Sequence, residues 1–403
     1  MKNQKKNILV ITPWSINDAL IQTYTLPYLK IVRGIISDET EIHLVTQEKN
    51  TNHFYQTEKK KDFIWLPIPY FRFGFRAMIQ FVKSVLFLKK YIKNESISIL
   101  HSWCTPAGMT AYFLHQPGKI KWIADSFEPH AEAMIENGTW RKNSMAFRIL
   151  FHFEKKITQY DDELISIAPG MSEYIRNRYE INRQIKYIKP AAVDLKLFSI
   201  ANKKKSELIE KYNLKNKIVC LYAGKFGGIY LDKEVFDFFH CCVKFWQEKV
   251  SFLLLTNESQ ENIKALAKEY SIPEKQILIE FVAHKNVPDM AGLADFAICP
   301  VKPVPTKKYC SPIKTGEYWA LGLPVLIPAG ISNDSQIIEE NNAGYVWNKL
   351  CKEEYESSIK FLDKLLSTKS TKEIYETIRP LAERFRNFSM SEKIYTEIYK
   401  EKI

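Results

Sequence analysis

A lysine and a glutamate stand three residues apart in the stretch SPIKTGEYWALGLPVLIP, residues 311–328. Lys314 falls in the first turn of a predicted helix, where its charge opposes the positive end of the helix dipole. An anion held by the free amides of that turn would favour a lysine there. Glu317 could accept two hydrogen bonds from a vicinal diol such as a ribose. The alternative is an exposed ion pair that stabilises the helix by only about 0.2–0.5 kcal/mol.

Both ends of this helix have local signals. Ser311 is expected to cap it, Pro312 suits its first position, and Gly322 can end it. These signals predict a helix over 312–321, followed by a short buried strand.

A glycine-rich loop is the second candidate for anion binding. It lies in the stretch YAGKFGGIYLDKE, where Gly224, Gly227 and Gly228 would let backbone amides approach a ligand closely. Lys225 and Lys233 add positive charge. Such a loop suits a diphosphate better than a metal, because it offers few carboxylates. Taken alone, it fits a turn with solvated lysines equally well.

Apolar runs alternate with helical patterns in two series along the chain. Strands are predicted at 7–12, 41–46, 63–68, 97–103, 120–125, 163–168 and 184–189, and then at 217–223, 250–256, 276–282, 295–300, 323–327 and 343–347. Helices are predicted between many of them, at 21–36, 75–93, 144–160, 170–179, 232–247, 259–270, 286–293, 312–321 and 334–341. Continuous apolar strands that alternate with helices indicate parallel sheets covered on both faces. Both candidate stretches follow strands, and ligands bind at the carboxyl ends of such strands.

The two series predict an α/β protein with two doubly wound, Rossmann-like domains that face each other across a cleft. We expect the first domain at 1–197 and the second at 198–387. The chain beyond 352 lacks strands and predicts three helices. The last of these, 388–403, is expected to pack back on the first domain.

Composition excludes several classes of protein. Hydrophobic residues make up 46% of the 403, so the chain is not disordered. The seven cysteines form no CxxC pair, which favours buried thiols in a reducing compartment. The first apolar run is too short for a signal peptide, and no run reaches the roughly 18 residues of a spanning helix. We therefore expect a cytoplasmic protein, at most at the inner face of a membrane.

Four segments resemble those of glycosyltransferase family 4, whose members have the GT-B fold. SPIKTGEYWALGLPVLIP resembles the family's nucleotide-sugar signature, and IKPAAVDLKLF, YAGKFGG and NDSQIIEENNAGYVW resemble its other segments in the expected order. The resemblance implies a hexosyltransferase-type enzyme that moves a sugar from a nucleotide-sugar to a glycan or lipid-linked acceptor in surface-polysaccharide biosynthesis. It implies retention of anomeric configuration and no cofactor besides the nucleotide-sugar co-substrate.

The resemblance also implies roles for single residues. Lys225 and Lys233 would neutralise the donor diphosphate, and Glu317 would bind the ribose. The donor site would comprise Gly224, Lys225, Lys233, Ser311, Ile313, Lys314, Thr315 and Glu317. Two departures stand out: the first of the family's two glutamates falls at Tyr309, and its usual loop arginine is replaced by Lys225.

The first domain supplies candidate catalytic residues in IADSFEPHAEAM, which follows a strand. His130 would act on the acceptor or the transferred sugar, and Asp125 or Glu128 would orient it; the alternative is a structural histidine. Trp14 and Asp18 are expected on the acceptor side. The sequence contains no Asp-x-Asp triplet and no HExxH motif, so we predict a metal-independent mechanism in which lysines and helix amides stabilise the departing diphosphate.

Residues 58–93 interleave aromatic and basic side chains, and the whole chain has a net charge of +12. This stretch could contact an anionic membrane. We expect the helix at 75–93 to be a core helix with a solvated face, and the aromatic loop 70–75 to be the better membrane candidate. No RNP-like motif or zinc spacing accompanies these residues, so nucleic acid is not expected as a partner.

Two other functions stay open from the sequence. A nucleotide-sugar 2-epimerase of the same fold would convert the donor without an acceptor. A non-catalytic basic membrane adaptor would have no affinity for nucleotides.

Overall fold

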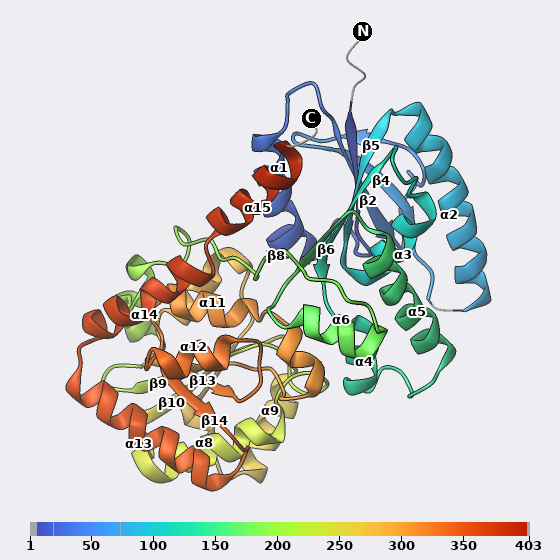
Figure 1. Ribbon diagram of the computed structural model, residues 1–403. Coiled ribbons are helices and arrows are strands. Elements are labelled where there is room, and N and C mark those ends of the chain that lie inside the picture. Colours follow the sequence, from blue (N-terminus) through green and yellow to red (C-terminus); the bar gives the residue numbers. More distant parts are fainter. Residues whose placement is uncertain (1–5, 19, 73, 401–403) are drawn as a thin grey trace. The chain divides into compact units, whose positions relative to one another are not determined.

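The computed structural model describes residues 6–18, 20–72 and 74–400 (Figure 1). Position 73 of the predicted aromatic loop and positions 401–403 of the predicted last helix lie outside the described residues. The chain forms two compact units, residues 1–189 with 389–403, and residues 190–388. Residues 190–197, which we expected in the first domain, thus belong to the second unit.

In its described residues, the first unit holds an eight-stranded sheet in the order β3-β4-β2-β1-β5-β6-β7-β8. The strands are β1 (Asn7–Ile11), β2 (Ile42–Glu48), β3 (Glu58–Lys59), β4 (Ile64–Pro69), β5 (Ile97–Trp103), β6 (Lys121–Phe127), β7 (Glu163–Ser166) and β8 (Tyr187–Ile188). Only the short β3 pairs antiparallel. In the centre, Ile8 of β1 lies between Ile42 and Ile99, so a continuous apolar layer runs across the sheet.

Helices cover both faces of this sheet. They are a short π-helix (Ile21–Thr25), α1 (Leu26–Ile35), α2 (Phe75–Asn94), α3 (Cys104–Leu114), α4 (His130–Glu136), α5 (Met145–Tyr160), α6 (Met171–Tyr179) and α15 (Phe388–Lys400). Figure 1 shows α1 and α15 on one face and α2, α3 and α5 on the other. Helix α3 was not expected, because it follows β5 without a linker and Cys104 takes a left-handed φ of 59° at the junction.

The second unit holds a six-stranded parallel sheet in the order β11-β10-β9-β12-β13-β14. Its strands are β9 (Ile218–Ala223), β10 (Val250–Leu255), β11 (Ile277–Glu280), β12 (Phe296–Ile298), β13 (Val325–Pro328) and β14 (Gly344–Trp347). Its α-helices are α7 (Ser206–Lys211), α8 (Lys233–Trp246), α9 (Gln260–Glu269), α10 (Val287–Ala291), α11 (Ile313–Ala320), α12 (Asp334–Glu340), α13 (Lys352–Thr368) and α14 (Thr371–Phe385). Short 3₁₀ helices lie at Ile200–Asn202, Gln247–Lys249, Glu274–Gln276, His284–Asn286 and Pro305–Tyr309.

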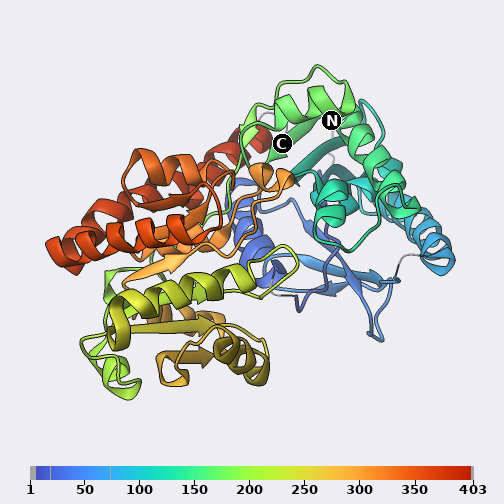
Figure 2. The ribbon, with the colours of Figure 1, turned by 90° about the horizontal axis from the view of Figure 1, so that it is seen from below.

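Two apolar cores lie on opposite faces of the second sheet. Helices α10, α11, α12 and α14 contribute to one core, and α8, α9 and α13 to the other. Figure 2 shows these strands between their helices. Each predicted strand overlaps an observed one, and the predicted fold class of two Rossmann-like α/β domains is confirmed. No helix in the described part of the chain is both long and apolar enough to cross a bilayer.

The first unit contains a buried ion pair between Lys189 and Asp125. A tyrosine of the last helix, α15, is hydrogen-bonded to both. Lys189 Nζ lies 2.9 Å from Asp125 Oδ1, and both side chains are fully buried. Tyr395 of α15 donates a hydrogen bond from Oη to Asp125 Oδ2 at 2.6 Å and accepts one from Lys189 at 2.9 Å. The Lys189 ammonium also lies 4.0 Å from the ring centre of Tyr28 and 4.8 Å from that of Trp103.

His101 of β5 extends this network. Its Nε2 lies 3.0 Å from Asp125 Oδ2, and its Nδ1 lies 2.8 Å from the hydroxyl of Tyr399. Burial alone would raise the pKa of the Asp125 carboxyl, but Lys189 and His101 hold it well below its usual range. Asp125 is therefore a charged group without access to water, and these partners come from β5, from the residue that follows β8, and from α15.

We expect Lys189→Met to lower the free energy of unfolding by about 3–5 kcal/mol, because the Asp125 carboxylate would stay buried without its cation. The double variant Lys189→Met/Asp125→Asn should recover part of this loss, since the unpaired charge is gone. Urea denaturation followed by circular dichroism measures both. A double variant no more stable than Lys189→Met would contradict the ion-pair explanation.

Candidate functional site

The strand order of the second unit places its candidate site at β9 and β12. From β9 the chain proceeds to β10 and β11 on one side, and β12 then pairs with β9 on the other side. Ligands of open α/β sheets bind at the carboxyl ends of strands where the order reverses in this way. The loops after β9 and β12 carry the two stretches that the sequence singled out.

The glycine-rich loop after β9 is held against the chain that follows β12. Leu231 N–H donates to Pro300 O at 2.7 Å, and Lys302 N–H donates to Ile229 O at 2.9 Å. Gly227 and Gly228 have φ angles of 76° and 62°, which side chains other than glycine rarely adopt. The turn is therefore fixed in shape by hydrogen bonds and depends on its two glycines.

Several donors of this loop have no partner in the described part of the chain. The backbone N–H groups of Lys225, Phe226, Gly228 and Ile229 donate to no acceptor among the residues that the structure describes. The exposed ammonium of Lys225 forms no ion pair with any described residue. Successive free amides beside glycines with positive φ form a concavity that suits an anion.

The two other lysines near this loop are paired. Lys233, the first residue of α8, lies 3.5 Å from Glu269 at the end of α9, and both side chains are more than half exposed. Lys302 lies 3.4 Å from Glu234. Of these two, only Lys302 forms a backbone hydrogen bond with the glycine-rich loop. Lys302 was not among the residues predicted for the site.

Helix α11 begins without a side-chain cap. It starts at Ile313 after Pro312, and no side chain accepts from its first turn. The prediction that Ser311 caps the helix is wrong, because its hydroxyl accepts the N–H of Ala191 at 2.9 Å instead. The first-turn amides, including that of Thr315, therefore have no side-chain cap at the switch point.

The Lys314–Glu317 pair is not the exposed pair considered as the alternative. Lys314 Nζ lies 2.8 Å from Glu317 Oε2, but the glutamate side chain is only 4% exposed. His284 Nε2 lies 3.9 Å from the other carboxylate oxygen. Burial alone would raise the pKa of Glu317, but Lys314 and His284 outweigh it and leave the pKa below its ordinary value. The site thus holds a buried, ionised carboxylate.

His284 is not part of any motif that the sequence shows. It lies in the 3₁₀ helix that follows β11, and its only local signal is its place after a predicted strand. Its approach to Glu317 depends on strand order, which a single sequence does not specify.

Two arginines hold α11 in place. Arg379 of α14 donates to Ala320 O at 2.7 Å and to Leu195 O at 2.9 Å, which ties the end of α11 to the segment before the second sheet. The buried guanidinium of Arg386 is hydrogen-bonded to Asp334 and lies 5.4 Å from the ring centre of Trp319. The position of the helix N-terminus is therefore set by tertiary contacts.

The C-terminal end of α11 forms as predicted. Gly322 has a φ of 63°, and Leu323 N–H donates to Tyr318 O at 2.9 Å. This is the Schellman arrangement, in which a glycine takes the left-handed position just past the helix.

The first unit presents its candidates at the carboxyl ends of β1 and β6. The loop after β1 is anchored by the buried carboxylate of Glu48, which accepts from Ser15 Oγ at 2.5 Å and Ile16 N–H at 2.7 Å. Trp14 is half-buried in this loop. Asp18 accepts the N–H of Leu20 at 2.8 Å, so its carboxylate helps to start the following helical segment.

The three acidic and histidine candidates after β6 are not equivalent. His130 and Glu128 are both partly exposed, with Nδ1 and Oε1 3.7 Å apart. Asp125 is instead enclosed by Lys189 and its aromatic neighbours. The structure therefore gives Asp125 an anchoring position, and its expected role in orienting His130 stays a prediction.

Helix α4, which starts at His130, is held by a buried carboxylate of α5. Glu154 accepts the N–H of Ala131 at 2.8 Å and the hydroxyl of Tyr179 at 2.9 Å. Burial raises the pKa of this carboxyl to about 7, although both hydrogen bonds act in the opposite direction. Protonation of Glu154 is thus coupled to the anchoring of the helix that carries His130.

Comparison with solved structures identifies the fold. Sucrose-phosphate synthase from Thermosynechococcus elongatus is similar, with a TM-score of 0.72 at 14% identity over 98% of this chain and 99% of that chain. WaaG, a glycosyltransferase involved in lipopolysaccharide biosynthesis, gives 0.70 at 13% identity over 97% and 99%. HepE of Anabaena in complex with UDP gives 0.68 at 10% identity over 98% and 100%. This chain has the GT-B fold.

The GT-B fold expected from the four sequence motifs is thereby confirmed. No protein-family model matches the chain, and no curated protein matches it either. The likeness at 10–14% identity therefore concerns the fold, and the chemistry has to be argued from residues.

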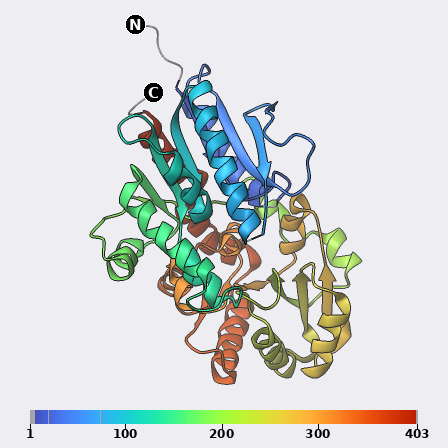
Figure 3. The same cartoon turned by 90° about the vertical axis from the view of Figure 1, so that its right-hand side faces the viewer.

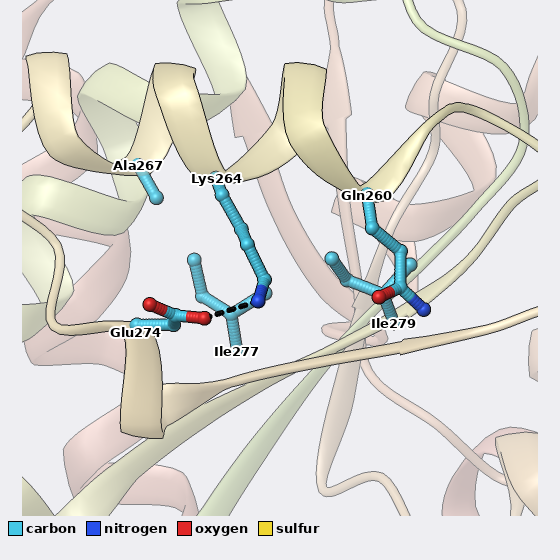
Figure 4. A pocket seen from close by; sticks show the side chains of 6 residues that line it. All are labelled: Gln260, Lys264, Ala267, Glu274, Ile277 and Ile279. Atoms are coloured by element: carbon cyan, nitrogen blue, oxygen red, sulfur yellow. Dashed lines mark ion pairs between the residues drawn. The ribbon is translucent and has the colours of Figure 1, made fainter.

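The second unit also has a pocket that lies away from this site. It has a volume of about 230 Å³ and lies between α9 and the edge strand β11. Figure 4 shows the Lys264–Glu274 ion pair across it, beside Ile277 and Ile279. Strand β11 is separated from β9 by β10, so the pocket is away from the switch point.

Gly316→Ala is expected to destabilise the protein by about 1–3 kcal/mol, because α11 has no room for a methyl group there. The added Cβ would lie 2.8 Å from Val193 Cγ2 and 3.0 Å from Arg386 Cγ. Gly34→Ala in α1 is the matched control, since that position has open space. Thermal unfolding measures the stability of both variants. If Gly316→Ala lowers stability no more than Gly34→Ala, the packing at Gly316 is not as close as described.

The free energy of unfolding should fall as pH rises from 4.5 to 7, partly through Glu154. In this window the folded protein retains a proton that the unfolded chain has released, because the pKa rises from 4.5 to about 7 on folding. Glu154→Gln removes this contribution, so its stability should fall by roughly 2–3 kcal/mol less across the window. Urea denaturation at several pH values tests this, and parallel profiles would contradict it.

Proposed function

We propose that this chain is a glycosyltransferase that moves a sugar from a nucleotide-sugar donor to a glycan or lipid-linked acceptor. The observation that carries the proposal is the buried Glu317 carboxylate next to the uncapped start of α11, at the switch point of the second sheet. A buried ionised carboxylate is costly unless it has partners. Ribose hydroxyls would supply the hydrogen bonds that Lys314 and His284 leave open.

The donor diphosphate would occupy the concavity formed by the glycine-rich loop and the first turn of α11. Four loop amides that donate to no described acceptor and the Lys225 ammonium supply positive potential, and Gly224 lies beside Pro300. The same groups would stabilise the charge that develops on the diphosphate as the sugar leaves. Ile313, Lys314 and Thr315 would contribute first-turn amides.

The first unit would bind the acceptor at the edge that carries Trp14 and Asp18. His130, supported by Glu128 and by the α4 anchor at Glu154, is the group proposed beside the reacting sugar. Metal independence rests on the sequence, which has no Asp-x-Asp triplet, and retention of configuration rests on the family resemblance. Five of the seven free cysteines are buried, which agrees with a reducing, cytoplasmic compartment.

Titration calorimetry with UDP, GDP, ADP and CMP tests the donor site. UDP comes first because HepE, a structural neighbour, was solved in complex with it. One nucleotide should bind selectively, and Lys225→Ala should weaken it by about 10–100-fold through loss of a charge-assisted contact. Lys264→Ala in the second unit is the control and should leave binding unchanged.

The role of Glu317 has a test of its own. Wild type should prefer the nucleotide over its 2′-deoxy analogue, and Glu317→Gln should lose most of that preference. A wild type that binds no nucleotide, or variants that bind as tightly as wild type, would overturn the proposal. Conversion of the donor sugar without an acceptor would instead indicate a nucleotide-sugar 2-epimerase.

A further inference from the structure

Helix α2 exposes a row of large apolar side chains. The exposed fractions are 71% for Phe75, 57% for Met78, 41% for Ile79, 52% for Val82 and 62% for Leu86. Their positions along the helix place all five on one side, and the buried Ser84, Leu88 and Tyr91 lie on the opposite side. The helix thus has a core side and a solvated side, as expected, but the solvated side of its first three turns is largely apolar.

The rest of the outward surface of α2 is basic. Lys89, Lys90 and Lys93 continue the same side of the helix after Leu86, and Arg76 and Lys83 lie along its border. The helix contains no aspartate or glutamate. None of these five cations forms an ion pair with a residue in the described ranges. We call the five apolar residues together with Lys89, Lys90 and Lys93 the α2 face.

Neighbouring helices extend the apolar area. Figure 3 looks onto the outer side of the layer that contains α2, α3 and α5. Phe113 of α3 is partly exposed and lies 5.6 Å, ring centre to ring centre, from Phe81 of α2. Met145 and Ile149 of α5 are also exposed. A single helix row would be an ordinary surface feature, but an apolar area over three helices points to a binding surface.

The apolar half of α2 lies at the functional edge of its sheet. Strand β4 ends at Pro69 and α2 starts at Phe75, so the helix begins at the carboxyl ends of the strands. The loop with Trp14 and the start of α4 at His130 are at this edge as well. The lysines lie towards the opposite edge.

We propose that the α2 face binds the surface of an anionic lipid membrane. Helices with one apolar and one basic region lie in the membrane interface, with the apolar side chains at the headgroup–acyl boundary. Here the basic side chains would reach anionic headgroups, and each contributes roughly fivefold to binding. The further idea that this surface delivers a lipid-linked acceptor to the carboxyl edge rests on the proposed function, whereas membrane binding does not.

Charge decides against a protein partner such as a second copy of the chain. Lysine is depleted in protein–protein interfaces, yet three lysines occupy the α2 face. Two copies that met through this face would bring like charges together without any acid from α2 to offset them. An anionic membrane offers acyl chains to the apolar side chains of the α2 face and anionic headgroups to its lysines.

Co-sedimentation with vesicles tests the proposal. The full chain should bind vesicles of phosphatidylcholine with phosphatidylglycerol, bind phosphatidylcholine alone at least tenfold more weakly, and dissociate at high salt. Lys89→Gln/Lys90→Gln/Lys93→Gln should weaken binding by roughly a hundredfold, from about fivefold per lysine. Phe75→Ser/Val82→Ser/Leu86→Ser should weaken it by at least about tenfold.

Matched variants in the second unit control for charge and hydrophobicity. Lys264→Gln/Lys352→Gln/Lys372→Gln removes the same net charge from other exposed lysines, and Phe245→Ser/Phe281→Ser removes exposed aromatic rings. Both should bind vesicles like wild type. If the lysine controls lose as much affinity as the α2 variant, binding depends on overall charge and the proposed face is wrong.

Other outcomes would also overturn the proposal. These are no vesicle binding by wild type, equal binding to both vesicle types, or a dimer in light scattering that only the apolar α2 variant dissociates. Circular dichroism of every variant verifies folding, and nucleotide titration is run in parallel. A wild type that binds no nucleotide would count against the proposed function. It would not affect the test of membrane binding.

Discussion

The buried Lys189–Asp125 pair is the contact on which the first unit depends most. Two charges can remain away from water only when each has close partners, and here these lie on β5, β6 and α15 and just after β8. The first unit is made of two stretches of chain. Lys189 is the last residue of the first stretch, and Tyr395 belongs to the second stretch, 389–403. Both connections to the second unit are therefore anchored in one cluster of side chains.

The second unit uses buried charge in a different way. Arg386 pairs with one oxygen of Asp334 and Arg379 donates to backbone carbonyls, so both help to fix α11 from within the unit. Glu317, by contrast, is buried with only Lys314 and the more distant His284 near its carboxylate, which leaves it hydrogen-bonding capacity for the proposed ligand. Among the described residues, the start of α11 has no side-chain cap and four loop amides have no acceptor, while other contacts hold these segments. Rigid support together with such donors would preorganise the proposed anion site.

Patterns of apolar residues predicted the strands well, because parallel strands buried on both faces are short continuous runs. The position of Lys314 and Glu317 on one helix also followed from local spacing. What could not be predicted depends on long-range contacts. Asp125 meets Tyr395 across 270 positions, and His284 approaches Glu317 only through strand order. Ser311 looked like a cap, but a distant backbone N–H competes for its hydroxyl. The exposed side of α2 could not be predicted from periodicity alone, because apolar residues occur on both the exposed and the buried side of this helix.

The anchoring of α15 also has a consequence for biosynthesis. The first 189 residues leave the ribosome with a lysine and an aspartate that lack the tyrosines of the last helix. At roughly 5–20 residues per second, the following 200 residues take on the order of tens of seconds to arrive. The second unit is continuous in sequence and can close during that interval. The part of the protein that is translated first is thus the part that is completed last.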